Sequence, residues 1–143
     1  MKFIFKVHKD CVNLNKLLLL DRDGVVIKDT GYPYLKNKII FENQNIKKIK
    51  SIIQNHDYDA CGFITNQSGV GRNYFSEEQF WECHNFIIKK CLSLGILINF
   101  TAVNFFKEES YYRKPRSGML EQAKFYYDIS YKKILFIGDK KSD

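Results

Sequence analysis

Four short apolar runs constrain the fold of this sequence more than any other feature. A strand with one wet face alternates polar and apolar residues, whereas these runs are apolar almost throughout, so both of their faces should be buried. The first run ends in four consecutive leucines, and polar or glycine-containing segments follow each run. The runs span residues 16–20, 60–65, 97–103 and 134–137. They predict a parallel sheet covered on both sides.

Helical patterns separate these runs. Residues 77–94 form the longest one, which opens with a Ser76/Gln79 capping box and stops before Gly95, a residue typical of the position after a helix. A shorter pattern covers residues 119–127. An earlier pattern shows helical spacing of its isoleucines, Ile46, Ile49, Ile52 and Ile53. Alternating strands and helices predict right-handed crossovers and a three-layer α/β/α domain.

The 143 residues suffice for one domain, which we assign to residues 16–143. Residues 1–15 lie outside the alternation and form an N-terminal extension. Within it, Phe3, Phe5 and Val7 alternate with other residues, which allows an added edge strand. Ligands of such parallel sheets bind beyond the carboxyl ends of the strands.

Composition indicates a soluble, cytoplasmic protein. No apolar stretch reaches the ~18 residues that cross a bilayer, and the N-terminus does not resemble a signal peptide, so no membrane partner is expected. The formal charge of +7 comes from scattered lysines, which indicate solvated helix faces as readily as a nucleic-acid surface. Nucleic acid is therefore not the expected partner.

The four cysteines show no C-x-x-C spacing, and reduced, structural thiols are the favoured interpretation. Cys83, His84 and Cys91 also suggest a zinc site, since residues eight apart share a helix face. Adjacent residues, however, project ~100° apart on a helix. We therefore favour ordinary packing for these three residues.

Two carboxylates follow the first predicted strand, in Asp21-Arg22-Asp23-Gly24. In an extended segment, residues i and i+2 project to the same side, so Asp21 and Asp23 should face one site while Arg22 points away. Two close carboxylates repel unless a cation neutralises them, and Mg²⁺ takes hard oxygen ligands. The alternative is a simple Asp-Gly turn at the end of a strand.

Three further polar segments follow predicted strands. Thr65-Asn66-Gln67-Ser68-Gly69 offers a hydroxyl, two amides and backbone N–H groups that can cradle phosphate oxygens. Arg113-Lys114-Pro115 offers paired cations. The last run ends before Asp139 and Asp143, which share a face if the segment is helical, and a metal would suit them. Each segment alone can be an ordinary loop, but all fall at the same predicted sheet edge.

With these motifs in order, the sequence resembles the haloacid-dehalogenase-like phosphatase superfamily. The resemblance runs from about Leu17 to the last residue and implies a fold without a large cap domain. Its details resemble D-glycero-D-manno-heptose 1,7-bisphosphate phosphatases, in a branch shared with histidinol-phosphate phosphatases. The matching segments are Leu20 to Gly24, Gly31-Tyr32, Thr65 to Arg72, Arg113 to Pro115 and Gly138 to Lys140.

The resemblance implies a role for each matching residue. Asp21 would attack phosphorus and Asp23 would act as general acid and base, while Thr65 and Lys114 would hold the phosphoryl oxygens. Mg²⁺ would be bound by Asp21, the carbonyl of Asp23 and the carboxylates Asp139 and Asp143. The implied substrate-binding residues are Asp29, Thr30, Gly31, Tyr32, Asn66, Gln67, Ser68, Arg113 and Lys140.

Two departures from the family pattern shape further expectations. Many relatives carry a zinc loop before the Arg-Lys-Pro segment, but residues 104–112 contain neither Cys nor His, so we predict no structural zinc. The family also continues past its metal carboxylates with a helix and a strand. We therefore expect that the C-terminal part of the domain is missing after Asp143 or is replaced by a partner.

The leading hypothesis from sequence is thus a Mg²⁺-dependent phosphatase of a phosphorylated small molecule, such as a heptose bisphosphate. A histidinol-phosphate or nucleic-acid 3′-phosphatase on the same scaffold is the second hypothesis. A catalytically inactive binding domain is the third, and the set of catalytic residues argues against it. We expect a monomer.

Overall fold

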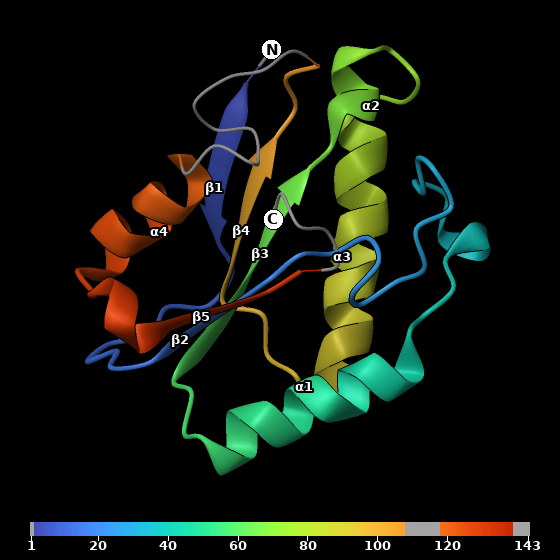
Figure 1. The fold of residues 1–143 in the computed structure, drawn as a ribbon. Helices are drawn as coiled ribbons and strands as arrows, with labels where there is room; N and C mark the ends of the chain where they lie inside the picture. The colour runs from blue at the N-terminus through green and yellow to red at the C-terminus, as the bar shows by residue number, and fades with distance from the viewer. Residues whose placement is uncertain (1, 108–117, 139–143) are drawn as a thin grey trace.

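The computed structural model describes residues 2–107 and 118–138. Strands and short or long helices alternate along this part of the chain (Figure 1). In order, the elements are β1 (Phe3–Val7), β2 (Leu17–Leu20), the 3-10 helix η1 (Lys36–Lys38), α1 (Asn43–Asn55), β3 (Ala60–Asn66), α2 (Ser68–Gly71), α3 (Glu77–Ser93), β4 (Phe100–Asn104), α4 (Gly118–Tyr127), the 3-10 helix η2 (Tyr131–Lys133) and β5 (Ile134–Ile137).

The described strands form one five-stranded sheet in the order β1-β4-β3-β2-β5. Strands β2 to β5 run parallel, and β1 pairs with β4 in the antiparallel direction. The fold is therefore α/β with a mostly parallel sheet, which confirms the predicted fold class. Strand β2 lies between β3 and β5, so the residues that follow it emerge between two other strand ends.

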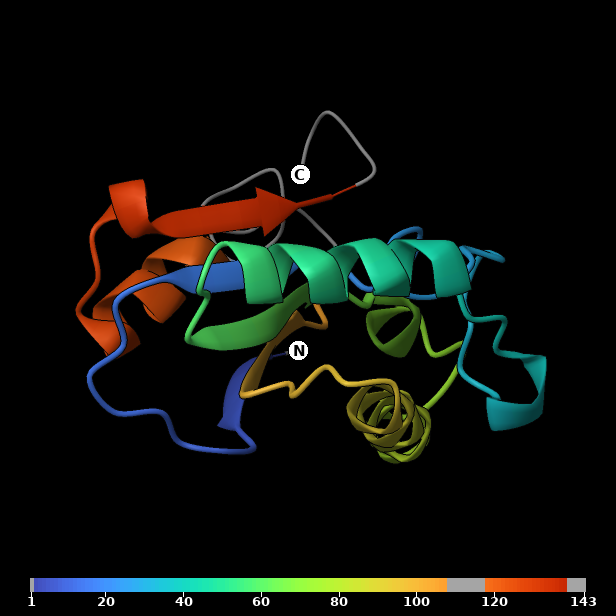
Figure 2. The same ribbon diagram turned by 90° about the horizontal axis from the view of Figure 1, so that it is seen from below.

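The four leucines of β2 show how the sheet is covered on both faces. Leu18 and Leu20 pack in a core cluster with residues of α1 and α3. Leu17 and Leu19 pack in a second cluster with residues of α4. All four are fully buried, which stabilises the fold by about 1.5–3 kcal/mol for each side chain. Figures 1 and 2 show the resulting layers, with α4 on one side of the sheet and α1 and α3 on the other.

A glycine inside β3 accommodates an aromatic ring from the neighbouring strand. Gly62 pairs with Phe100 of β4, and a Cβ atom at Gly62 would overlap the Phe100 ring. Phe5 of β1 stacks on the other side of that ring, with centroids 4.8 Å apart. The strand therefore contains glycine because the ring occupies the space of a side chain.

The predicted boundaries of the longest helix, α3, are confirmed to within one residue. The Ser76 side chain accepts a hydrogen bond from the Gln79 N–H at 3.0 Å, and the Gln79 side chain accepts one from the Ser76 N–H at 2.8 Å. This is the predicted capping box. Gly95, just after the helix, has φ +95°, a conformation that glycine adopts without strain.

The third predicted strand is wrong at its start, because β4 begins at Phe100 rather than at residue 97. The preceding residues form a buried connection, in which Ile96 and Ile98 face the core and Leu97 is 44% exposed. Asn99 ends this connection by bonding to another strand: its side-chain oxygen accepts the Cys61 N–H at 3.0 Å. An apolar run thus indicated burial correctly but not strand geometry.

Within residues 2–107 and 118–138, no helix has the length and apolar character that crossing a membrane requires.

Candidate active site

The candidate site lies at the carboxyl edge of the sheet, where the parallel strands end together. Asp21 follows β2, Thr65 and Asn66 end β3, and Asn104 ends β4. Pairing of Leu20 with both Phe63 and Ile137 sets β3 and β5 on either side of Asp21. The Asp21 N–H donates to the Ile137 carbonyl at 2.9 Å, so this residue still belongs to the β2–β5 seam.

The chain turns sharply immediately after Asp21. The carbonyl of Arg22 accepts the N–H groups of Val25, Val26 and Ile27 at 3.3, 2.9 and 3.2 Å. Gly24 has φ 89°, which a residue with a side chain rarely adopts. The segment is therefore a tight loop and not an extension of the strand.

This turn corrects the predicted position of Arg22. The alternation of an extended strand placed its side chain away from the carboxylates, yet Nε of Arg22 donates to Oδ1 of Asp23 at 2.7 Å. Arg22 is fully buried. Strand alternation did not predict the contact between Arg22 and Asp23, because the strand β2 ends at Leu20 and the alternation ends with it.

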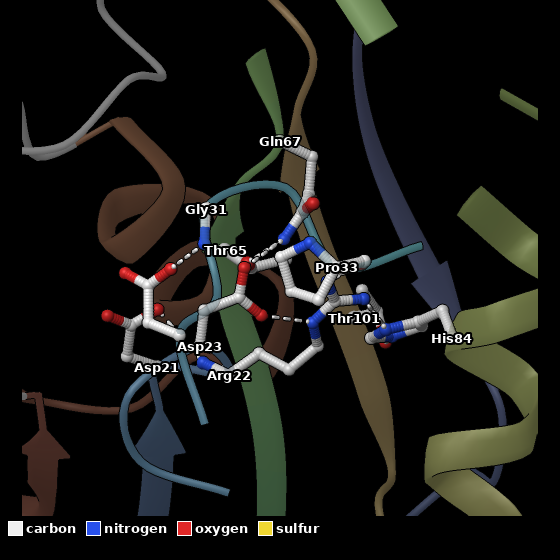
Figure 3. A network of polar contacts seen from close by, with 10 residues as sticks. Asp21, Arg22, Asp23, Gly31, Pro33, Thr65, Gln67, His84 and Thr101 are labelled. Carbon is white, nitrogen blue, oxygen red and sulfur yellow. Dashed lines mark hydrogen bonds and ion pairs between the residues drawn. The ribbon is translucent and has the colours of Figure 1, made fainter. Parts of the chain in front are cut away.

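Asp23 and Thr65 are connected by one side chain from the second polar segment. Nε2 of Gln67 donates to Oγ1 of Thr65 at 2.8 Å and lies 3.4 Å from Oδ2 of Asp23. Figure 3 shows the Asp23 carboxylate between Arg22 and Gln67. Thr65 and Gln67 are buried, so both lie in the floor of the site.

Asp21 is oriented by the backbone. Its Oδ1 accepts the N–H of Arg22 at 2.9 Å, and the residue is 7% exposed. A carboxylate in such a position is held in place yet still reaches the surface.

The first predicted substrate-binding segment forms a turn beside the site. Oδ1 of Asp29 accepts the Gly31 N–H at 3.0 Å, and Gly31 has φ +99°. Thr30 is exposed. Tyr32 is 44% exposed and meets the Tyr74 ring edge-on, with centroids 4.8 Å apart.

This segment contacts the polar segment after β3. A Cβ atom at Gly69, in α2, would lie 2.9 Å from Cδ1 of Tyr32, so the ring packs directly on that helix. Ser68 begins α2, and Oδ1 of Asn66 accepts a hydrogen bond from the Asn104 side chain at 3.4 Å. The structure thus brings two of the predicted substrate-binding segments together.

The remaining predicted site residues lie outside the described part of the chain. They are the cations Arg113, Lys114 and Lys140 and the carboxylates Asp139 and Asp143. In the described ranges, no group of three His, Cys, Asp or Glu side chains is arranged to hold a metal ion.

Cys83, His84 and Cys91, considered above for zinc, are part of the core around α3. Both cysteines are buried and free, and burial raises the pKa of Cys91 to about 12. The two ring nitrogens of His84 contact Arg22 and Thr101. Sequence analysis did not single out Thr101 or connect His84 to the site, because their relation to Arg22 arises only when α3 packs on the sheet.

The chain is similar to known phosphatases. Residues 16–142 match the family described as polynucleotide kinase 3 phosphatase. A D-glycero-alpha-D-manno-heptose-1,7-bisphosphate 7-phosphatase of Burkholderia mallei is 31% identical over 138 residues, covering 90% of this chain and 72% of the relative. A histidine biosynthesis bifunctional protein of Bacteroides fragilis is 29% identical over 133 residues, covering 90% of this chain and 35% of that protein.

Two solved structures share the fold. A HAD-like phosphatase from Mesorhizobium loti superposes with a TM-score of 0.86 at 25% identity, over 99% of this chain and 72% of that one. A D,D-heptose 1,7-bisphosphate phosphatase from B. bronchiseptica, solved with magnesium and phosphate, gives a TM-score of 0.79 at 25% identity, over 89% of this chain and 72% of that one.

Fold and site together define a phosphatase of the haloacid-dehalogenase-like class, a phosphoric monoester hydrolase. The chain belongs to the polynucleotide kinase 3 phosphatase family, in the branch that includes the heptose bisphosphate phosphatases and the histidine biosynthesis bifunctional protein.

Proposed function

We propose that this protein is a Mg²⁺-dependent phosphatase that removes phosphate from a phosphorylated sugar, D-glycero-D-manno-heptose 1,7-bisphosphate or a close relative, through a phosphorylated Asp21. The observation that carries the proposal is the pair of carboxylates at the end of β2. One is oriented by the backbone at the β2–β5 seam, and the other is fixed by Arg22.

Asp21 is proposed as the nucleophile. Its carboxylate would attack phosphorus and form an acyl phosphate as the sugar oxygen leaves. Burial to 7% exposure keeps most water away from this carboxylate, and the N–H of Arg22 orients it from behind. A carboxylate that is already oriented loses little conformational freedom on reaching the transition state, and this favours attack.

Asp23 is proposed as the general acid and base. It would protonate the leaving sugar oxygen and then take a proton from the water that attacks the acyl phosphate. Its side chain is 18% exposed, and it follows Asp21 by two residues in the chain. Water and the leaving group can therefore reach it.

Charge on the transferring phosphoryl group needs donors fixed in place. Thr65 Oγ1 and the backbone N–H groups after β3 are the proposed donors from the described residues, and Lys114 is the proposed cation. Because Thr65 already accepts a hydrogen bond from Gln67, its own hydroxyl proton is free to point toward a phosphate oxygen.

The donor set also fits magnesium. Asp21 and the carbonyl of Asp23 supply hard oxygen atoms, and Asp139 follows in the sequence two residues after β5, the strand that pairs with β2. We propose these three residues, with Asp143 as a further carboxylate, as the ligands. When bound, Mg²⁺ would neutralise charge on the phosphate and on the clustered carboxylates.

The sugar assignment rests on the relatives and on the exposed segment beside the site. The Burkholderia mallei relative acts on a heptose bisphosphate, as its name states. The proposed contacts with the sugar are Asp29, Thr30, Gly31, Tyr32, Asn66, Gln67, Ser68, Arg113 and Lys140. A nucleic-acid 3′-phosphate is the second candidate, supported by the family match.

A substrate panel tests this proposal. Phosphate release is measured with Mg²⁺ from heptose 1,7-bisphosphate, histidinol phosphate and a 3′-phosphorylated oligonucleotide, using wild type and Asp21→Asn. We expect the highest kcat/KM with the heptose and no release by Asp21→Asn. Faster release from the oligonucleotide would select the second candidate, and no Mg²⁺-dependent release from any substrate would favour a binding domain without chemistry.

A further inference from the structure

Arg22 is a fully buried cation that lies directly beside the candidate acid of the site. We propose that Arg22 is a positioning residue, which fixes the carboxylate of Asp23 for proton transfer and is itself held in place by His84 and Thr101. This inference rests on the proposed phosphatase function and adds to it a network of side chains that begins at the fully buried Arg22.

The guanidinium group uses each of its nitrogen atoms. Nε donates to Oδ1 of Asp23 at 2.7 Å, a short, charge-assisted bond. Nη1 lies 3.2 Å from Nδ1 of His84, and Nη2 donates to the carbonyl of Pro33 at 3.4 Å. Burying a charge costs free energy unless the charge is paired, and these partners offset that cost for Arg22. The Pro33 contact also ties the turn at residues 29–32 to the same cation.

The partners determine which way the hydrogen bonds run. Arginine has no acceptor, so Nδ1 of His84 must accept from Arg22, and the ring proton must be on Nε2. That Nε2 then donates to Oγ1 of Thr101 at 2.8 Å. The Thr101 hydroxyl is also 2.8 Å from Nε2 of His8 and can donate to it. The result is a directed chain from Arg22 through His84 and Thr101 to His8.

This geometry requires a neutral His84, and its surroundings favour one. Burial, and then the charges of Arg22, His8 and Lys6, hold the pKa of His84 well below its usual range. A protonated ring would place a donor against the guanidinium group and break the contact. Arg22 therefore keeps a stable acceptor over the working range of a neutral-pH enzyme.

Aromatic rings hold both side chains in position. The Phe80 ring stacks on His84 with centroids 4.9 Å apart and an interplanar angle of 18°. The guanidinium carbon of Arg22 lies 5.3 Å from the centroid of the same ring. Phe63, from β3, meets His84 edge-on at 5.3 Å. Figure 3 shows His84 and Thr101 on the side of Arg22 away from Asp21, so these residues can act on the reaction only through Arg22.

Arg22 determines which carboxylate oxygen of Asp23 is available for proton transfer. Oδ1 is held by Arg22, whereas among residues 2–107 and 118–138 the partner of Oδ2 is Gln67, at the longer distance of 3.4 Å. Oδ2 is therefore the oxygen that carries the proton to the leaving group. Without Arg22, or with Arg22 released from His84, the carboxylate can rotate and present either oxygen in any direction.

Two substrates that differ only in their leaving group test this role. Phenyl phosphate needs a proton on its leaving oxygen more than p-nitrophenyl phosphate does, because p-nitrophenolate departs as a stable anion. The variants are Arg22→Lys, His84→Leu and His84→Gln, each measured with Mg²⁺ on both substrates. His84→Gln is the matched control, since its amide oxygen can accept from Arg22 and its amide N–H can donate to Thr101.

We expect Arg22→Lys and His84→Leu to lower kcat/KM for phenyl phosphate about 10- to 100-fold, while kcat/KM for p-nitrophenyl phosphate falls much less. His84→Gln should keep the wild-type ratio of the two values. This ratio does not depend on how much enzyme is folded, so reduced yield of a variant cannot imitate the effect.

Equal losses on both substrates would overturn the inference and leave Arg22 and His84 as structural residues. A change of the ratio in His84→Gln equal to that in His84→Leu would overturn it as well. Wild-type protein that hydrolyses neither substrate would instead contradict the proposed phosphatase function itself, so the two failures are distinct.

Discussion

The backbone N–H of Asp21 donates a 2.9 Å hydrogen bond to the carbonyl of Ile137, the last residue of β5. This bond extends the β2–β5 pairing one residue beyond β2. It places the candidate nucleophile beside the strand that leads to Asp139, two residues further along the chain. We propose that carboxylates from distant parts of the sequence share a cation at this seam between β2 and β5.

The first prediction concerns that cation. We expect EDTA to abolish phosphate release and added Mg²⁺ to restore it, because the clustered carboxylates need a cation to accept a phosphate dianion. Asp139→Asn should raise the Mg²⁺ concentration needed for half-maximal activity, measured by titration. Glu121→Gln, which removes a carboxylate in α4, is the control and should titrate as wild type does. Unchanged Mg²⁺ dependence in Asp139→Asn would remove this residue from the ligand set.

The second prediction concerns Gln67, which bridges Thr65 and Asp23. Gln67→Leu keeps a similar volume but removes both contacts, so the side chains of Thr65 and Asp23 are no longer held relative to each other. We expect kcat to fall between about 10- and 100-fold with a smaller change in KM, because misplaced catalytic groups affect the transition state most. Steady-state kinetics on p-nitrophenyl phosphate measures this. A change in KM alone on this substrate, which has no sugar, would show that Gln67 does not position Thr65 and Asp23.

The third prediction concerns the packing of Gly62 against Phe100. Gly62→Val should lower the free energy of unfolding by about 1–3 kcal/mol or more, because the added side chain has no space. Urea unfolding followed by fluorescence or circular dichroism measures it. Gly62→Ala should cost less in a Phe100→Leu background than in wild type, since the smaller side chain relieves the overlap. Additive effects in the double variant would show that the ring does not occupy this space.

The fourth prediction concerns pH. The pKa of His84 is lowered in the folded protein, first by burial and then by the charges of Arg22, His8 and Lys6, so the unfolded chain binds more protons. Its contribution to stability is complete above the usual histidine pKa of 6.5 and is lost as the pH falls below it. The slope should reach up to about 1.4 kcal/mol per pH unit.

Urea unfolding at about pH 8 and about pH 5 measures this loss of stability. His84→Gln should lose less stability between the two pH values than wild type does. A residual slope is expected, because burial also lowers the pKa of His8. An identical slope in wild type and His84→Gln would contradict a neutral, buried His84.

Sequence patterns predicted those parts of the molecule that depend on residues close together in the sequence. The leucines of β2, the capping box of α3 and the left-handed Gly95 each follow from a few neighbouring residues, and each is confirmed. The predicted start of β4 was wrong because apolar residues pack in a buried connection as readily as in a strand. Burial alone does not distinguish the two.

The interior of the site could not be predicted in the same way. Arg22 was expected to point away from Asp23 because strand alternation was continued through a turn that begins at Asp21. His84 and Thr101 are separated from Arg22 by more than sixty residues, and only the packing of α3 against β4 brings them to it. Local sequence does not encode such contacts, whereas the motifs at strand ends predict a ligand site without them.

The central claim is that Asp21 carries the phosphoryl group, and rapid acid quenching followed by peptide mass spectrometry tests it most directly. The Asp23→Asn variant is mixed with p-nitrophenyl phosphate and Mg²⁺, because the missing base should slow hydrolysis of the intermediate more than its formation. We expect a phosphoryl group on Asp21, absent in Asp21→Asn/Asp23→Asn. Release of p-nitrophenolate with no phosphorylated peptide, or with the phosphoryl group on another residue, would contradict the claim.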